Sequence, residues 1–380
     1  MVAKTIFGLE EILAKELADL GAQNIRTANR SVTFDGDKEI LYKANLCLRT
    51  AGRVLVPLTT CKILKPDDLY KATRTVNWLD YLKADGRMII DSVVNFNKSF
   101  KNSMYAAQLT KDAIVDQIRA KTGKRPSIDN TKPDIRINLH INKTDCSIAL
   151  DSSGDPLNKR GYRTERTLAP LNECLAAGIL KLCCYDGSRP LIDPMCGSGT
   201  FAIEAAMIAL NRAPGLIRKN YAFMLWLDYE KGLYEKVKSD AEKKSHKSLR
   251  HPIIGSDRNK QVIEKAKTHA KRAGLQSIVK FEKMNIIDQI PPEGKGIAIC
   301  NAPYGERLDE KEIEQLYTTI GDSFKHKYEG YDAYLFTGNL KAAKSVGLKT
   351  SQKIKLYNGQ IECRLFKYEM YRGSKKFKPE

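Results

Sequence analysis

The chain has 380 residues, and its 64 lysines and arginines exceed its 45 aspartates and glutamates, which gives a formal net charge of +19. This length predicts two or three domains, and the positive charge favours a polyanionic partner such as a nucleic acid over a surface that is merely well hydrated. The nine cysteines include no Cys-x-x-Cys pair, which argues against a zinc ribbon and a disulfide framework. No apolar run approaches the roughly 20 residues of a bilayer span, which argues against a membrane protein.

The N-terminal segment predicts a small unit of helices and strands. Apolar residues at helical spacing predict a helix over residues 8–20, and Gly21 follows it as a helix-stop signal. Residues 31–34 are expected to form a strand and residues 38–46 a second helix. We therefore expect a ferredoxin-like N-terminal part over residues 1–50.

Residues 51–152 predict a second unit of mixed structure. The expected strands cover residues 54–62, 87–94, 134–141 and 146–150, and the expected helices cover 67–76 and 103–121. The run from Phe96 to Ser103, followed by Lys111 to Asp116, resembles the THUMP domain, an RNA-binding module. The resemblance implies that RNA is contacted by the cations around the second helix, namely Lys98, Lys101, Lys111, Lys121, Lys124 and Arg125. A generic ferredoxin-like domain is the alternative, because a fold alone does not give a function.

Residues 153–170 are expected to be a linker between domains, because they are basic, rich in turn-forming residues and poor in apolar ones. Arg160 and Arg163 lie in this segment and are expected to contact RNA. A solvated linker whose arginines have no functional partner is the alternative.

The sequence from Leu191 to Thr200 combines a short apolar strand, the acid Asp193 and a Gly-x-Gly turn, followed by a helical run over residues 201–210. A doubly wound α/β sheet uses this order to offer backbone amides and one carboxylate to a nucleotide-like ligand. The segment is not a P-loop and lacks the third glycine of the dinucleotide fingerprint, so an ordinary strand-turn-helix is the alternative. The expected cofactor contacts are Asp193, Pro194, Cys196, Gly197, Ser198, Gly199 and Thr200.

A second acid ends the next expected strand, after an unusually long connection. Asp257 closes the apolar run that starts at Pro252, and residues 211–250, with their lysine-rich helix, are interpreted as an insertion. A carboxylate at the C-terminal end of such a strand can accept hydrogen bonds from ribose hydroxyls, so Asp257 is the expected ribose anchor. An N-cap for the helix expected over residues 259–272 is the alternative.

The segment from Ile297 to Tyr304 predicts the reactive part of the site. A buried-strand pattern stops at Asn301, and Pro303 fixes its own φ and forces Ala302 to be extended. Here the chain resembles the class I S-adenosylmethionine-dependent methyltransferases that act on exocyclic amino groups, whose motif is Asn/Asp-Pro-Pro-Tyr/Phe. It resembles more closely the THUMP-containing 23S rRNA guanine N2-methyltransferases of the RlmL type. Ala302 replaces the family's usual proline but keeps its carbonyl oxygen.

The resemblance implies an α/β fold class for the C-terminal part. We expect a Rossmann-like class I methyltransferase domain over residues 171–380, with a mostly parallel seven-stranded sheet whose last strand is antiparallel, preceded by small α+β ferredoxin-like and THUMP domains. A helix is expected over residues 310–327 and a strand over 333–337. Two alternating segments around Asn358 and Gly359 predict a hairpin at the end of the sheet.

The resemblance also implies roles for single residues. The implied cofactor is S-adenosylmethionine, with Asn285 and Asp288 beside its adenine and Asn301 as a further cofactor contact. The side-chain oxygen of Asn301 and the carbonyl of Ala302 would accept the two hydrogens of the target amino group. Tyr304 would stack on the base.

The implied substrate is a guanine in 23S rRNA, and a tRNA guanine is the second reading. Adenine in DNA is a further reading, which the THUMP-like unit disfavours. A different class of function is also considered, in which the chain is a non-catalytic RNA-binding assembly factor, and only Ala302 favours this alternative. The cytoplasm is the expected compartment, whereas the target nucleotide, the oligomeric state and the roles of Glu306 and Arg307 are left open.

Cysteine and metal chemistry are disfavoured. A cysteine nucleophile at Cys196 or Cys300 is a weak alternative, because one precedes a glycine turn, the other ends an apolar strand, and free cysteine is commonly a small core residue. The five histidines show no metal-ligand spacing, so no metal site is expected.

Overall fold

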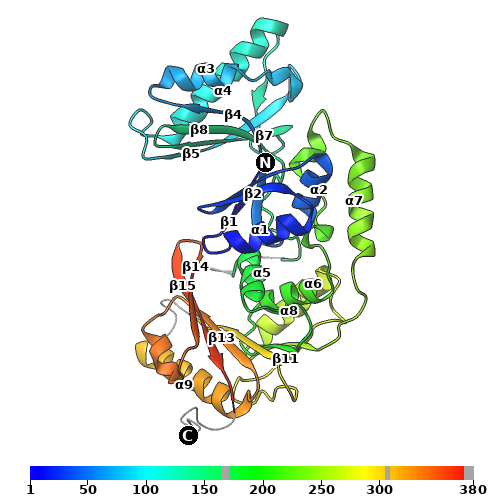
Figure 1. Cartoon of the computed structure of the whole chain (residues 1–380), viewed down its shortest axis with the longest axis vertical. Helices are drawn as coiled ribbons and strands as arrows, with labels where there is room; N and C mark the ends of the chain where they lie inside the picture. The colour runs from blue at the N-terminus through cyan, green and yellow to red at the C-terminus, as the bar shows by residue number, and fades with distance from the viewer. Residues whose placement is uncertain (164–170, 304–308, 372–380) are drawn as a thin grey trace. The chain divides into compact units, whose positions relative to one another are not determined.

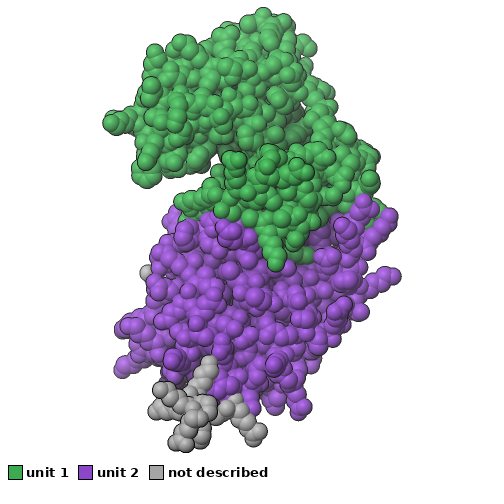
Figure 2. Space-filling model, in the orientation of Figure 1, with its two compact units in different colours: residues 1–5, 14–157, 218–239 green, residues 6–13, 158–217, 240–380 purple. Residues whose placement is uncertain are grey.

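The computed structural model describes residues 1–163, 171–303 and 309–371. They form two compact units, which are coloured separately in Figure 2. Unit 1 comprises residues 1–5, 14–157 and 218–239, and unit 2 comprises residues 6–13, 158–217 and 240–380. Within the described ranges, no helix combines the length and the apolarity needed to cross a membrane.

Unit 1 contains an eight-stranded sheet in the order β2-β3-β1-β4-β8-β7-β5-β6 (Figure 1). Its strands are β1 (Val2–Thr5), β2 (Gln23–Ala28), β3 (Ser31–Asp35), β4 (Ala51–Lys62), β5 (Arg87–Asn95), β6 (Ser127–Ile128), β7 (Ile135–Asn142) and β8 (Asp145–Asp151). Its helices are α1 (Glu10–Asp19), whose first turns belong to unit 2, α2 (Lys38–Cys47), α3 (Pro66–Arg74), η1 (Trp78–Asp80) and α4 (Ser103–Thr122). β4 pairs antiparallel with β1 on one side and with β8 on the other, so the ferredoxin-like and THUMP-like parts share one sheet.

β2 and β6 have no counterpart among the strands expected from the sequence. Five of the six residues of β2 are exposed and only Ile25 is half-buried. β2 therefore lies at the sheet edge without the apolar alternation on which strand prediction depends. β6 has two residues, both exposed, and is too short to produce a pattern.

Helix α4 shows why local sequence defines its ends. The Asn102 side chain accepts a hydrogen bond from the Met104 amide, and Gly123 ends the helix with a φ of 71°. Both arrangements satisfy backbone groups that a helix end leaves unpaired. The buried face of α4 packs against β-strand residues and Trp78 in one hydrophobic core, as its apolar spacing predicts.

Part of the expected insertion belongs to unit 1. Tyr42 of α2 packs against Phe223 and Tyr234, with ring centroids 4.7 and 5.9 Å apart, and its hydroxyl accepts a hydrogen bond from the Glu230 amide at 3.0 Å. Lys38 of α2 forms an ion pair with Glu230 at 2.8 Å. The elements in this region are η2 (Pro214–Ile217), η3 (Ala222–Leu225) and α7 (Lys231–Lys243). The expected insertion is thus divided between the two compact units.

Unit 2 contains a seven-stranded sheet in the order β11-β10-β9-β12-β13-β15-β14. Its strands are β9 (Leu191–Asp193), β10 (Ile253–Asp257), β11 (Lys280–Lys283), β12 (Ile297–Asn301), β13 (Asp332–Thr337), β14 (Gln352–Asn358) and β15 (Ile361–Glu369). β9 to β13 are parallel, and β15 pairs antiparallel with β13 and β14. The predicted Rossmann-like fold with an antiparallel last strand is confirmed.

Helices cover both faces of this sheet. They are α5 (Glu173–Leu182), α6 (Thr200–Ala209), α8 (Lys260–Arg272), α9 (Glu310–Lys327) and η4 (Ala342–Val346). In β12, Ile297 and Ile299 join a core with residues of α5, α6 and α8, whereas Ala298 and Cys300 join a second core with residues of α9. Because successive side chains of a strand point to opposite faces, this alternation places α9 on the face opposite α6.

Candidate active site

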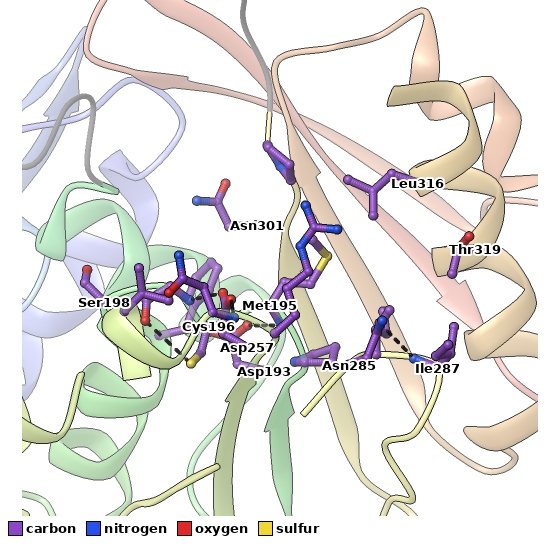
Figure 3. A pocket seen from close by; sticks show the side chains of 18 of the residues that line it. Asp193, Met195, Cys196, Ser198, Asp257, Asn285, Ile287, Asn301, Leu316 and Thr319 are labelled. Carbon is purple, nitrogen blue, oxygen red and sulfur yellow. Dashed lines mark hydrogen bonds between the residues drawn. The ribbon is translucent and has the colours of Figure 1, made fainter. Parts of the chain in front are cut away.

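A pocket of about 1050 Å³ lies at the carboxyl ends of β9, β10 and β12 (Figure 3). In an open parallel sheet, ligands bind at this edge where the strand order reverses, and here the order reverses between β9 and β12. Ten residues expected from the sequence line the pocket, namely Asp193, Pro194, Cys196, Gly197, Ser198, Thr200, Asp257, Asn285, Asn301 and Pro303. Gly199, Asp288 and Ala302 are not among its lining residues.

Asp193 ends β9 at the bottom of the pocket. Its side chain is 2% exposed and accepts a hydrogen bond from the Met195 amide at 3.3 Å. Burial raises the pKa of this carboxyl well above its usual range, and the neighbouring Asp257 raises it further. Among residues 1–163, 171–303 and 309–371 no cation pairs with Asp193, and a buried acid of this kind that faces a pocket is typical of a functional site rather than of a structural ion pair.

The two glycines of the loop have different roles. The Gly197 amide donates to Asp257 Oδ2 at 3.2 Å, and a Cβ built on Gly197 would meet no atom within 4 Å. Gly199 has a φ of 81°, and a Cβ there would lie 2.7 Å from the Phe281 ring. Gly197 therefore borders open space in the pocket, whereas Gly199 is required by packing beneath it.

Asp257 connects the glycine loop to the loop after β10. Its Oδ2 accepts from the Gly197 amide, and its Oδ1 accepts from the Asn259 amide at 2.9 Å. The N-cap of α8 is Asn259, whose side chain accepts from the Gln261 amide at 2.8 Å. The alternative role of Asp257 as the N-cap is therefore wrong, and its carboxylate lies in the pocket wall.

The loop after β11 contributes Asn285, Ile286 and Ile287 to the pocket. Asp288 is exposed, and its amide donates to the Asn285 carbonyl at 2.9 Å. Figure 3 shows Asn285 and Ile287 on one side of the pocket floor. The structure thus brings Asn285 to the site and leaves Asp288 outside it.

Asn301 is the last residue of β12, and its side chain lines the pocket (Figure 3). Its Oδ1 atom is buried and has no hydrogen-bond partner in the part of the chain that the structure describes. A buried acceptor without a donor is costly, so such an atom at a pocket is poised for a donor from a ligand. Ala302 is fully buried beside it, whereas Tyr304, Glu306 and Arg307 lie outside the described residues.

Helix α9 supplies pocket residues that the sequence analysis did not identify. Lys311, Gln315 and Thr319 line the pocket from one face of α9, and Figure 3 shows Thr319 with Leu316 projecting toward the cavity. The opposite face carries Ile313, Tyr317 and Ile320, which are buried. The spacing of four residues between Lys311, Gln315 and Thr319 is the sequence signal that could have identified the pocket-lining face of α9.

Arg160 and Arg163 both make polar contacts within unit 2. The Arg160 side chain is 2% exposed and lies 3.5 Å from Glu204 of α6, whose carboxylate also accepts from the Tyr162 hydroxyl at 3.2 Å. Arg163 forms an ion pair with Glu173 at 2.8 Å and donates to Thr200 Oγ1 at 2.7 Å. The prediction that Arg160 contacts RNA is wrong because its guanidinium is buried. Arg163 is held by Glu173 of α5 and Thr200 of α6, and its contact with RNA stays a prediction.

The cations expected around α4 differ in their surroundings. Lys98, Lys101 and Arg125 are exposed and form no ion pair within the described ranges. Lys111, Lys121 and Lys124 contact Asp112, Asn77 and Asp85, respectively, at 2.7, 2.8 and 3.6 Å. The exposed, unpaired cations are therefore the better candidates for phosphate contacts.

Cys196 and Cys300 are buried, and burial raises the pKa of each thiol well above its ordinary value. A thiol held in its neutral form is a poor nucleophile. This geometry argues against a cysteine mechanism and agrees with a packing role for both residues.

Family models match the chain in successive regions. An RlmL ferredoxin-like domain matches residues 1–55, a THUMP domain matches residues 65–151, and an RMKL-like methyltransferase domain matches residues 160–367. A Synechocystis sp. protein named as an RNA methyltransferase is 38% identical over 365 residues, which cover 96% of this chain and 95% of that protein.

Two further relatives support the same assignment. The ribosomal RNA large subunit methyltransferase K/L of Syntrophotalea carbinolica is 39% identical over 374 residues, which cover 96% of this chain but only 52% of that protein. The crystal structure of SMU.472, described as a methyltransferase complexed with SAH, matches with a TM-score of 0.89 and 30% identity over 98% of both chains. The chain therefore belongs to the RMKL-like methyltransferase family and carries that family's RlmL ferredoxin-like and THUMP domains.

Proposed function

We propose that this chain transfers a methyl group from S-adenosylmethionine to the exocyclic amino group of a guanine in RNA, with 23S rRNA as the first candidate. The observation that carries the proposal is the buried Oδ1 of Asn301, which has no hydrogen-bond partner among the described residues and lies at a pocket that also contains Asp193 and Asp257. An amino group supplies the donor that this oxygen lacks. The named functions of the two curated relatives support RNA as the substrate class.

The pocket residues fit the cofactor. The open space above Gly197 lets a ligand approach the main chain closely, and Asp257 offers a carboxylate beside it. Asn285 and Ile287 would flank the adenine, and Asp193 and the start of α6 would face the opposite end. When bound, S-adenosylmethionine supplies an activated methyl group on its sulfonium.

The residues of the turn after β12 position the nucleophile. The lone pair of a base amino nitrogen is delocalised into the ring, so the nitrogen attacks only when its orbital is aimed at the methyl group. Asn301 Oδ1 and the Ala302 carbonyl would accept the two amino hydrogens and direct the lone pair away from the ring. Alignment of this kind is worth about 7 to 11 kcal/mol of the barrier.

Unit 1 is the proposed RNA-binding part. Lys98 and Lys101 lie on the loop before α4. Phe96 in the same loop is 86% exposed, and Met104 and Tyr105 in the first turn of α4 are 74% and 50% exposed. Exposed rings beside lysines suit unpaired nucleotides, because bases stack on aromatic faces while cations contact phosphates. The target guanine would be flipped out of its stack to enter the pocket.

Nucleoside mass spectrometry of rRNA and tRNA from a strain that lacks the gene tests the substrate. We expect an N2-methylguanosine to disappear from 23S rRNA and to return with the wild-type gene. Disappearance from tRNA alone would favour the tRNA reading, and unchanged methylation of both RNAs would contradict the proposal.

The Asn301 variants test the mechanism. Asn301→Ala removes the acceptor, so it should lose single-turnover methyl transfer while it keeps cofactor and RNA affinity. Asn301→Asp keeps an acceptor oxygen at the same place and should retain part of the rate. If Asn301→Ala reacts as fast as the wild type, amino-group positioning by Asn301 is wrong.

A further inference from the structure

Tyr317 connects helix α9 to the turn that carries Asn301. Its side chain is fully buried in the core that also contains Cys300 and Ala302. The Tyr317 hydroxyl lies 3.3 Å from the Pro303 carbonyl oxygen, and it also bonds to the hydroxyl of Thr337 at the end of β13.

The direction of these hydrogen bonds follows from the groups involved. The Pro303 carbonyl can only accept, so the single proton of the Tyr317 hydroxyl goes to it. The Thr337 hydroxyl then donates to Tyr317 while it accepts from the Asn339 amide at 2.9 Å. The result is a chain of hydrogen bonds that runs from the Asn339 amide through the buried hydroxyls of Thr337 and Tyr317 to the carbonyl of the exposed residue Pro303, and hydrogen bonds in such a chain strengthen one another.

This chain holds the turn at its downstream end. Upstream, Asn301 is fixed because it pairs with Phe336 in the register of β12 and β13. Ala302 lies between the two fixed points and has no ring to restrict its φ. The hydrogen bond to Pro303 therefore restricts a residue whose own side chain cannot do so.

We propose that Tyr317 is a positioning residue that orients the turn from Asn301 to Pro303 for methyl transfer. The inference rests on the proposed function, because it assigns a task to the Asn301 oxygen and the Ala302 carbonyl. Tyr317 does not line the pocket, so it acts through the turn and not on the substrate.

Tyr317→Phe is the direct test, because it removes the hydroxyl and keeps the ring that fills the core. On 23S rRNA from the deletion strain, the single-turnover rate should fall about tenfold to a hundredfold, the loss expected when a reacting group is displaced by about 1 Å. Cofactor affinity measured by calorimetry should stay within about twofold, because the turn supplies only part of the pocket. Amide hydrogen exchange at Asn301 and Ala302 should become faster.

Tyr331→Phe is a matched control. Tyr331 lies in the same core, and its buried hydroxyl donates to the carbonyl of another proline, Pro292, at 2.7 Å. Pro292 does not line the pocket. The control should lower the melting temperature about as much as Tyr317→Phe, but leave the transfer rate and the exchange at Asn301 unchanged.

A rescue variant separates positioning from general stability. Ala302→Pro restricts φ at residue 302 directly. In the Tyr317→Phe background it should restore most of the rate that Tyr317→Phe loses. If Tyr317→Phe does not fold, Thr337→Val removes the donor to Tyr317 at nearly constant shape and should act in the same direction.

The outcomes distinguish the two proposals. Wild-type rate and wild-type exchange in Tyr317→Phe, or in Thr337→Val if that variant is used, would overturn the positioning role. A wild-type chain that methylates no RNA would overturn the proposed function. The exchange measurement would then still decide whether Tyr317 holds the turn.

Discussion

The two glycines of the pocket loop should respond differently to alanine, although they are two residues apart in sequence. Residue 199 has a φ of 81°, and the new Cβ of Gly199→Ala would lie 2.7 Å from Phe281 Cζ and 3.0 Å from the Ala266 Cβ. The left-handed conformation costs about 1 to 2 kcal/mol, and overpacking of a core adds about 1 to 3 kcal/mol. We therefore expect the free energy of unfolding to fall by about 2 to 5 kcal/mol.

Gly197→Ala is the matched comparison. Its φ of 51° carries a similar conformational cost, but a Cβ at this position would meet no atom within 4 Å. The loss of stability should therefore be only about 1 to 2 kcal/mol. The new methyl group would occupy the open space over the main chain, so S-adenosylmethionine affinity should fall by about tenfold or more, the effect of losing about 1.4 kcal/mol of binding free energy.

Urea unfolding without cofactor and calorimetry with S-adenosylmethionine measure the two effects separately. The expected pattern is a large loss of stability for Gly199→Ala, and a large loss of affinity with modest destabilisation for Gly197→Ala. Equal stability losses in the two variants, or wild-type affinity in Gly197→Ala, would refute the division of roles between packing and ligand approach.

Variants at Asp193, at Lys98 with Lys101, and at Tyr328 test the pocket acid, the RNA surface and a buried hydroxyl, respectively. Because burial raises the folded-state pKa of Asp193, the native state binds this proton more tightly than the unfolded chain, and the free energy of unfolding falls as pH rises from about 4 through that pKa. In urea unfolding of the cofactor-free protein, the stability of Asp193→Asn relative to the wild type should therefore increase across this pH range. Calorimetry should show that the same variant binds the cofactor more weakly. The Lys98→Glu/Lys101→Glu double variant should bind single-stranded RNA with a log-log salt slope shallower by about 0.7 for each phosphate that is no longer neutralised, and an unchanged slope would remove these lysines from the RNA surface. Tyr328→Phe removes a buried hydroxyl that has no partner among the described residues, so chemical unfolding should show no loss of stability, whereas a loss above about 1 kcal/mol would reveal a partner.

Charge reversal is a better test of RNA binding than removal of the N-terminal part. Leu9 is fully buried in the core of unit 2, and the aromatic residues Phe223 and Tyr234 pack on Tyr42 in unit 1. A chain beginning near Leu157 would lack Leu9 and would expose the two aromatic rings. Its failure to bind RNA would therefore not separate recognition from folding.

Local sequence patterns determined most of the elements of the fold and much of the pocket. The helix expected over residues 310–327 is α9, because a capping box of Asp309 and Glu312 defines its start. The order of strand, Asp193 and Gly-x-Gly predicted the loop at the carboxyl end of β9, since its chemistry depends on neighbours in sequence. The same holds for Asn301, which ends β12 where the buried-strand pattern stops.

Only the tertiary structure decided the features that depend on partners far away in the chain. The sequence indicates that Arg160 is a solvated cation in a basic linker. In the structure it pairs in the interior with Glu204, which lies 44 residues later in the chain. The hydrogen bond from Tyr317 to Pro303, and the division of the expected insertion between two units, likewise need contacts that no local period encodes. Helix ends, turns and strand alternation depend on the φ preferences and the side-chain spacing of adjacent residues. The partner of a buried charge or of a backbone carbonyl depends instead on which distant group the fold brings within hydrogen-bond distance.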